Sequence, residues 1–316
     1  MKLSIHPRLP EVMQLLEEHF IQYDQGGLSA VYTQLLDFSG IASKEEQERL
    51  KPHLPYTHIR HLHKNYLQAV EKENTKHTAL SLTTDLPIFI ESSQGKDAPV
   101  VMVCAMDSLP TIPIKTGRNE YALHPHQNQT LDIKQDIGFW APFSLIEHNQ
   151  DANSLFFNQL LKSYSLYITD VYKLFFYIDK NRSDKNGRPV FSKSNSISTY
   201  RNQEIHSTLL LREIDLITPR CILTLGNNSG NALLKLYGKK LENWTAVHEN
   251  GGLQIHHLSQ SENAEKKIPM IAAPHISGAA NGAKSLVLNH PDWRHLRGTQ
   301  IEKYAQIVAH TILSNS

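Results

Sequence analysis

Four short apolar runs constrain the fold of this chain more than any other feature of its sequence. They are APVVMVCAMD (98–107), SLYITDVYKLFF (165–176), PRCILTLG (219–226) and IPMIAAPH (268–275). Their apolar residues are continuous rather than alternating, which is typical of parallel strands buried on both faces. Helical segments flank the third run, so strands and helices alternate. The sequence therefore predicts an α/β fold: a three-layer α/β/α sandwich around a central, mostly parallel four-stranded sheet.

The first part of the chain has a different pattern. Apolar residues recur at helical spacing in LPEVMQLLEEHFIQYDQ, SAVYTQLLDF and THIRHLHKNYLQAVEKE. We therefore expect a helical N-terminal region at 1–83 and an α/β domain at 84–316. His58, His61 and His63 do not follow a known ligand spacing, so we interpret them as a solvated or packing face rather than a metal site.

Composition excludes several classes of protein. The formal net charge of +1 over 316 residues gives no general attraction to nucleic acid or membrane, so any such attraction requires a local patch. Cys104 and Cys221 lie inside apolar runs and are expected to be buried free thiols, which favours a reducing compartment and excludes an iron–sulfur cluster. The N-terminus has no apolar signal core and no run is long enough to span a bilayer, so we expect a cytoplasmic protein without a membrane partner.

The candidate site lies where the four strands end, because ligands of parallel α/β sheets bind beyond the carboxyl ends of the strands. Asp107 ends the first run, Asp170 lies in the second, and His275 follows the fourth. After His275 comes ISGAANGAK, whose small side chains leave main-chain amides open to close approach. Each feature also has a structural interpretation: a carboxylate capping a turn, a packed histidine and an ordinary loop.

The motifs at these strand ends resemble those of the uracil-DNA glycosylase superfamily, in the same order and over about 97–316. Where the family has Gly-Gln-Asp-Pro, Ala-Phe-Ser, Ile-Thr-Asn-Val and His-Pro-Ser, this chain has Ala105-Met106-Asp107-Ser108, Pro142-Phe143-Ser144, Ile168-Thr169-Asp170-Val171 and His275-Ile276-Ser277.

The resemblance implies a DNA glycosylase that hydrolyses the N-glycosidic bond of a flipped-out base. Breaking this bond develops positive charge on the sugar and negative charge on the base. Asp107 is the candidate that stabilises the sugar cation and orients water, and His275 is the candidate donor to the base oxyanion. The candidate base-binding residues are Met106, Ser108, Phe143 and Asp170. Phe143 is either a stacking platform or a packed core residue.

Two departures from the family pattern concern the substrate. An ionised Asp170 only accepts hydrogen bonds, so it suits the exocyclic amine of cytosine better than the carbonyl of uracil. The alternative is that Asp170 caps the strand or pairs with Lys173. Ser108-Leu109 replaces the Pro-Tyr gate, and a polar insertion follows at 111–136. The resemblance therefore implies a C5-modified cytosine, such as glucosylated hydroxymethylcytosine in phage DNA, and a role in anti-phage defence.

DNA contacts are expected at two places. Ser277, Gly278 and Lys284 follow the last motif and suit a phosphate backbone. Arg182 and Arg188 lie in a basic segment, 179–203, that we expect to be flexible and that is either a phosphate-binding or a merely solvated loop. A second basic stretch, HPDWRHLRGTQIEK, contains Trp293 and is alternatively the start of the last helix.

The remaining expectations follow from what the chain lacks. We place no lysine as a Schiff-base nucleophile, so we predict base removal without strand cleavage, no cofactor and no metal, by a monomer. The N-terminal helices are open to three roles: bracing the sheet, contacting DNA or dimerising. Two other functions remain alternatives, namely a uracil or mismatch glycosylase of base-excision repair and a non-catalytic nucleic-acid-binding module.

Overall fold

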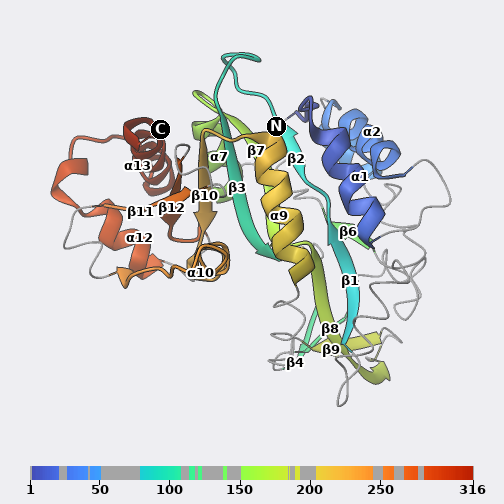
Figure 1. Ribbon diagram of the computed structural model, residues 1–316. Coiled ribbons are helices and arrows are strands. Elements are labelled where there is room, and N and C mark those ends of the chain that lie inside the picture. Colours follow the sequence, from blue (N-terminus) through green and yellow to red (C-terminus); the bar gives the residue numbers. More distant parts are fainter. Residues whose placement is uncertain are drawn as a thin grey trace.

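The structure is a computed structural model that describes residues 2–20, 27–41, 43–50, 79–107, 114–117, 120–122, 138–140, 151–183, 185, 189–192, 204–244, 252–259, 267–276 and 281–315. Within these residues the chain forms two six-stranded sheets with helices packed around them (Figure 1). The predicted α/β class is confirmed.

The helices of the structure are α1 Leu9–Phe20, α2 Gly27–Ser39, α3 Lys44–Leu50, α7 Ala152–Leu160, α9 Glu204–Ile217, α10 Asn227–Lys235, α12 Asn281–Leu288 and α13 Gln300–Asn315. The strands are β1 Ala79–Asp85, β2 Ile88–Ile90, β3 Val100–Asp107, β4 Ile114–Gly117, β5 Glu120–Ala122, β6 Gly138–Trp140, β7 Ser165–Tyr172, β8 Leu174–Ser183, β9 Pro189–Ser192, β10 Cys221–Leu225, β11 Gln254–Ser259 and β12 Lys267–Ala273.

The first sheet has the strand order β11-β12-β10-β3-β7-β2. The four apolar runs form its inner strands, β12, β10, β3 and β7, and each neighbouring pair among them is parallel. The two edge strands, β11 and β2, are antiparallel to their neighbours, so the sheet as a whole is mixed. Its inner strands are buried almost throughout, which is the reason that they read as continuous apolar runs.

Helices cover this sheet and share one hydrophobic core with it. In Figure 1, α9 lies across the near face of the sheet, where it contacts β7, and α1 lies next to it. Helix α13 packs against α7 and β12. Tyr304 of α13 and Phe156 of α7 are fully buried with ring centroids 5.6 Å apart, which shows how closely these two helices pack.

The N-terminal helices brace the sheet. Their apolar residues, Leu9, Leu16 and Leu35 among them, belong to the same core as β2, β3 and β7. The Tyr32 hydroxyl donates to the Ser4 carbonyl at 2.8 Å and accepts from the Phe89 N–H at 3.0 Å, which ties α2 to β2. Of the three roles open to these helices, the described contacts support bracing. The sequence boundary at 83/84 falls inside β1.

The sequence does not predict the second sheet. Its strand order is β4-β5-β9-β8-β1-β6. The run 165–176, expected to be one strand, is two: β7 in the first sheet and β8 in the second, separated by Lys173. Part of segment 179–203, expected to be flexible, is also regular, because 179–183 belong to β8 and 189–192 form its antiparallel partner β9. The local sequence is polar, so only the pairing with neighbouring strands indicates these elements.

Candidate functional site

The carboxyl ends of the four parallel strands meet at one edge of the first sheet. Ala105 of β3 lies opposite Asp170 of β7, Thr224 of β10 lies opposite Cys104, and Leu225 lies opposite Ala273 of β12. The segments carrying Asp107, Asp170 and His275 therefore lie along this edge. Strand β10 alone separates β3 from β12, and two strand spacings amount to about 10 Å.

Asp107 is the last residue of β3 and lies opposite Tyr172 of β7. The structure describes the main chain of Met106 and Asp107, and likewise the main chain of Arg182, which lies in β8. Five further candidates lie outside the described residues: Ser108, Phe143, Arg188, Ser277 and Gly278.

His275 lies next to the turn that follows β10. Gly226 follows that strand and precedes α10 with a φ of +95°, a conformation that favours glycine, and its N–H donates to the Ala273 carbonyl at 2.7 Å. A Cβ atom on Gly226 would lie 3.4 Å from the Cβ of His275, which is van der Waals contact, so His275 lies directly beside this glycine. The His275 side chain is exposed at the sheet edge.

The surroundings of His275 favour its neutral form. Although its side chain is exposed, desolvation by the protein on one side lowers the pKa of His275, and the positive charge of Lys284 lowers it further. A neutral imidazole has one N–H to donate and can do so without a charge of its own. This matches the role predicted for a donor to a developing oxyanion.

Lys284 holds the loop after β12 rather than pointing only to solvent. Its Nζ donates to the carbonyl oxygen of Ile276 at 2.6 Å, and partial burial lowers the pKa of Lys284. The sequence predicts that Lys284 binds DNA phosphate. Its described contact is within the protein and joins α12 to the segment that carries His275.

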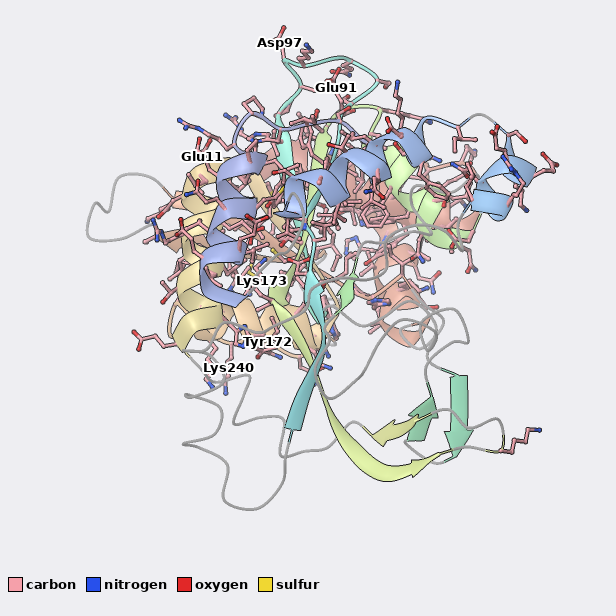
Figure 2. The ribbon with its side chains drawn as sticks, turned by 90° about the vertical axis from the view of Figure 1, so that its right-hand side faces the viewer. Glu11, Glu91, Asp97, Tyr172, Lys173 and Lys240 are labelled. Carbon is pink, nitrogen blue, oxygen red and sulfur yellow. The ribbon has the colours of Figure 1, made fainter. Side chains whose placement is uncertain are left out.

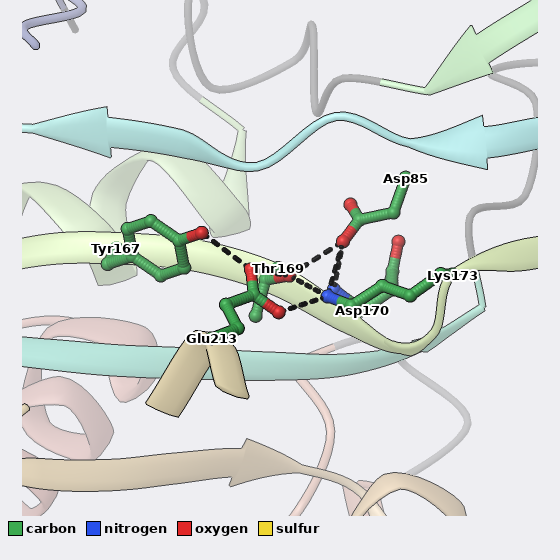
Figure 3. A network of polar contacts seen from close by, with 6 residues as sticks. All are labelled: Asp85, Tyr167, Thr169, Asp170, Lys173 and Glu213. Atoms are coloured by element: carbon green, nitrogen blue, oxygen red, sulfur yellow. Dashed lines mark hydrogen bonds and ion pairs between the residues drawn. The ribbon is translucent and has the colours of Figure 1, made fainter. Parts of the chain in front are cut away.

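Asp170 is almost completely buried, with 2% of its surface exposed. Its main-chain N–H donates to Oδ2 of Asp85 at 3.1 Å. In Figure 3 the Asp170 carboxylate points away from Glu213, whereas Thr169 points toward it, as the alternation of a strand requires. Asp170 therefore faces the other side of β7 from Glu213.

A buried cluster of ionisable residues lies directly beside Asp170, and the sequence did not predict it. Lys173, whose surface is fully buried, donates from Nζ to Asp85 Oδ2 at 2.8 Å and to Thr169 Oγ1, and forms an ion pair with Glu213 Oε2 (Figure 3). Tyr167 donates to Glu213 Oε1 at 2.5 Å. Figure 2 shows Lys173 inside the packed body of the molecule, with Tyr172 nearby. The available signal was weak: Lys173 and Glu213 each interrupt an apolar run.

Lys173 is held in its charged form. Burial lowers the pKa of Lys173, but the carboxylates of Asp85 and Glu213 more than offset this, so its pKa lies above the ordinary value. A protonated lysine is not a nucleophile. Lys173 is therefore unsuited to Schiff-base chemistry despite its place near the strand ends.

The Thr169 hydroxyl bridges the two carboxyl groups of the cluster. It is 2.6 Å from Asp85 Oδ2 and 2.9 Å from Glu213 Oε1, and it also accepts from Lys173. A hydroxyl has one proton, so it donates to only one of the two carboxyl groups at a time. Burial raises the pKa of Glu213, and the nearby Lys173 charge opposes this shift.

His206 of α9 completes the buried polar surroundings of Lys173. Burial and the nearby Lys173 charge lower the pKa of His206 to about 3, so its ring is neutral. The ring centroid lies 6.1 Å from that of Tyr172 in an edge-to-face arrangement. The sequence of α9 shows only that its apolar residues recur at helical spacing. This pattern does not indicate that His206 is buried near Lys173.

Two further predictions concern packing. Cys104 and Cys221 are buried free thiols, as predicted, and burial raises the pKa of Cys221 to about 12. Trp293 lies in a short 3-10 turn, Pro291–Trp293, and its ring packs at 5.4 Å from that of His310 on α13. The stretch 290–303 thus contains this turn and the start of α13, which favours its structural interpretation.

Among the described residues there is no group of three or more histidine, cysteine or acidic side chains placed to hold a metal. His58, His61 and His63 lie outside those residues. In the part of the chain that the structure describes, no helix has the length and apolar character needed to cross a membrane. Comparison of the chain with protein-family models and with curated proteins finds no match in either set.

Proposed function

We propose that this protein is a DNA glycosylase that removes a flipped-out, C5-modified cytosine and leaves an abasic site. One observation carries the proposal: the segments that contain Asp107, Asp170 and His275 lie together at the carboxyl ends of the four parallel strands. Residues far apart in the sequence would then face one nucleotide. The motif resemblance to the uracil-DNA glycosylase superfamily, and with it a three-layer sandwich around these four strands, belongs to the same proposal.

The roles follow from charge. As the glycosidic bond breaks, the Asp107 carboxylate stabilises the cationic sugar and orients the attacking water. His275, neutral because its pKa is lowered, donates its N–H to the oxyanion of the leaving base. The separation of about 10 Å between the ends of β3 and β12 leaves room for a nucleoside between the two groups.

Asp170 is the proposed reader of the base. A carboxylate accepts from the exocyclic amine of cytosine and repels the carbonyl that uracil has there. Its burial supports this role, because a desolvated acceptor strongly rejects a base that leaves it without a donor. Glucosylated hydroxymethylcytosine in phage DNA is the substrate that we favour, acted on in the cytoplasm by a monomer for anti-phage defence.

The test is a base-release assay with the purified protein. Oligonucleotides would contain cytosine, uracil, 5-hydroxymethylcytosine or its glucosylated form, and alkali would reveal abasic sites. We expect much faster base release from the glucosylated DNA than from the other three substrates, and its loss in Asp107→Asn and His275→Ala while DNA binding is kept. Release of uracil instead would favour a repair glycosylase. DNA binding without base release in any substrate would favour a non-catalytic module and overturn the proposal.

A further inference from the structure

We propose that Lys173 and Asp85 are positioning residues for Asp170: their buried ion pair fixes the main chain at Asp170 and so determines which base is selected. This inference rests on the proposed function of Asp170 as the reader. Neither residue need touch DNA, because both lie in the interior. Both act through the strand that carries Asp170.

The first step concerns the backbone around Asp170. Strands β1 and β2 run antiparallel to β8 and β7, and the flanking pairs are Thr84 with Leu174 and Ile88 with Ile168. From Thr84 to Ile88 the chain of β1 and β2 covers four residue steps, whereas from Ile168 to Leu174 the chain of β7 and β8 covers six. The β7–β8 side therefore bulges here, and its main-chain groups need partners other than a regular ladder.

The second step is that Asp85 supplies such a partner. One oxygen, Oδ2, accepts from the Asp170 N–H at 3.1 Å, from Thr169 Oγ1 at 2.6 Å and from Lys173 Nζ at 2.8 Å. The main-chain N–H of Asp85 donates in return to the Lys173 carbonyl at 2.7 Å. The bulge containing Asp170 is thus held from both of its ends by one residue of the opposing strand.

The third step concerns the charge. A carboxylate accepting from a main-chain N–H makes a stronger bond than a neutral acceptor, but it must be kept ionised inside the protein. Lys173 provides the opposite charge, and Glu213 anchors Lys173 to α9. The cation therefore compensates the buried Asp85 carboxylate and holds it next to the main chain of Asp170.

The test compares Lys173→Met and Asp85→Asn with a matched control, Ser165→Ala. Ser165 lies at the other end of β7, is also buried, and accepts from the Ser92 N–H at 3.0 Å. For each protein, kcat/KM would be measured on oligonucleotides containing glucosylated 5-hydroxymethylcytosine and containing uracil. The ratio of the two values is independent of the fraction of protein that is folded.

We expect the ratio to fall by at least about tenfold in Lys173→Met and Asp85→Asn and to change less than about twofold in Ser165→Ala. Asp85→Asn keeps the side-chain volume and provides the test if Lys173→Met does not fold. An unchanged ratio in Asp85→Asn, with stability lowered, would show a purely structural cluster and overturn the inference.

A second readout separates this inference from the proposed function. Hydrogen exchange of the Asp170 amide would be measured in the free protein, relative to amides of β10. We expect Asp85→Asn to accelerate it by at least about tenfold and Ser165→Ala to leave it unchanged. If the wild type releases no base but Asp85→Asn accelerates exchange of the Asp170 amide, the proposed function fails while the anchoring of Asp170 stands. If base release is found and exchange is unaffected, only the inference fails.

Discussion

Asp85 and Lys173 are joined twice: the Asp85 N–H donates to the Lys173 carbonyl at 2.7 Å, and Lys173 Nζ donates to the Asp85 carboxylate at 2.8 Å. The two residues lie where the chain passes between the sheets, from β1 to β2 and from β7 to β8. This one buried pair therefore links β1 of the second sheet to the end of β7, the strand of the first sheet that carries Asp170.

Removing the buried cation should strongly destabilise the protein. Lys173→Met leaves the carboxylates of Asp85 and Glu213 in the interior without their positive partner, and we expect the free energy of unfolding to fall by about 3–5 kcal/mol. Urea denaturation at pH 7 measures this. Lys239→Met is the control, because Lys239 donates at the surface to the His257 carbonyl. A loss in Lys173→Met no larger than that of the control would contradict the charge assignment.

Glu213→Gln should change how stability depends on pH. Because the folded protein raises the pKa of Glu213 above its ordinary 4.5, the protonated form stabilises the fold. That stability is complete below the unfolded pKa and is lost as pH rises through the folded pKa. Glutamine does not titrate, so the variant should gain stability relative to wild type as pH rises above 4.5.

Unfolding free energies measured by urea from about pH 2.5 to about pH 8 test this prediction. Glu302→Gln offers a control of opposite sign, since hydrogen bonds from Thr299 lower the pKa of Glu302. The wild-type carboxylate there contributes stability that is lost as pH falls. A difference between Glu213→Gln and wild type that stays constant with pH would mean that folding does not raise the pKa of Glu213.

Gly226→Ala should disturb His275 beyond its cost in stability. Gly226 has φ +95° and ψ 162°, a region essentially restricted to glycine, so alanine should cost about 1–3 kcal/mol, and the new Cβ would lie in contact with the His275 side chain. Gly95 has the same φ, but a Cβ added there would meet nothing within 4 Å, so Gly95→Ala is the matched control. We expect both variants to lose similar stability and only Gly226→Ala to shift the NMR signals of His275 and reduce base release. Equal effects on His275 would refute the contact.

Lys284→Met should raise the pKa of His275 toward 6.5, because the charge of Lys284 is one cause of its lowered value. An NMR titration of the His275 ring measures this directly. The substitution also removes the hydrogen bond to the Ile276 carbonyl. Lys240→Met tests whether any lysine removal has the same effect, and a His275 pKa that falls in Lys284→Met would rule out the electrostatic explanation.

Asp170→Asn should move base preference toward uracil, because an amide can donate to a carbonyl as well as accept. We expect kcat/KM on the modified cytosine to fall by at least about tenfold relative to that on uracil. Competition between the two oligonucleotides in one reaction gives this ratio. Unchanged preference would show that another residue reads the base.

Much of the first sheet could be predicted from the sequence, and the second could not. Strands β3, β7, β10 and β12 are continuous apolar runs because both of their faces are buried. Strand β11 alternates between buried and exposed residues over only six positions, a weak signal, and β4, β5 and β9 are short and depend on their neighbours for pairing.

The candidate site divides in the same way. The strand-end positions of Asp107, Asp170 and His275 follow from the rule for parallel sheets. The Asp85–Lys173–Glu213 cluster does not, because its members are distant in sequence and each alone resembles an ordinary surface charge. Only the tertiary packing of α9 and β1 against β7 brings them together.

The cluster also constrains how this sequence can diverge. Loss of Lys173 leaves two carboxylates in the interior without a positive partner, and loss of either carboxylate removes an acceptor of the buried lysine, whereas replacement of all three by apolar residues of similar volume need not be costly. Descendants of this chain should therefore keep Asp85, Lys173 and Glu213 together or exchange them together. Substitutions at these three positions, which lie in separate segments of the chain, would then be coupled.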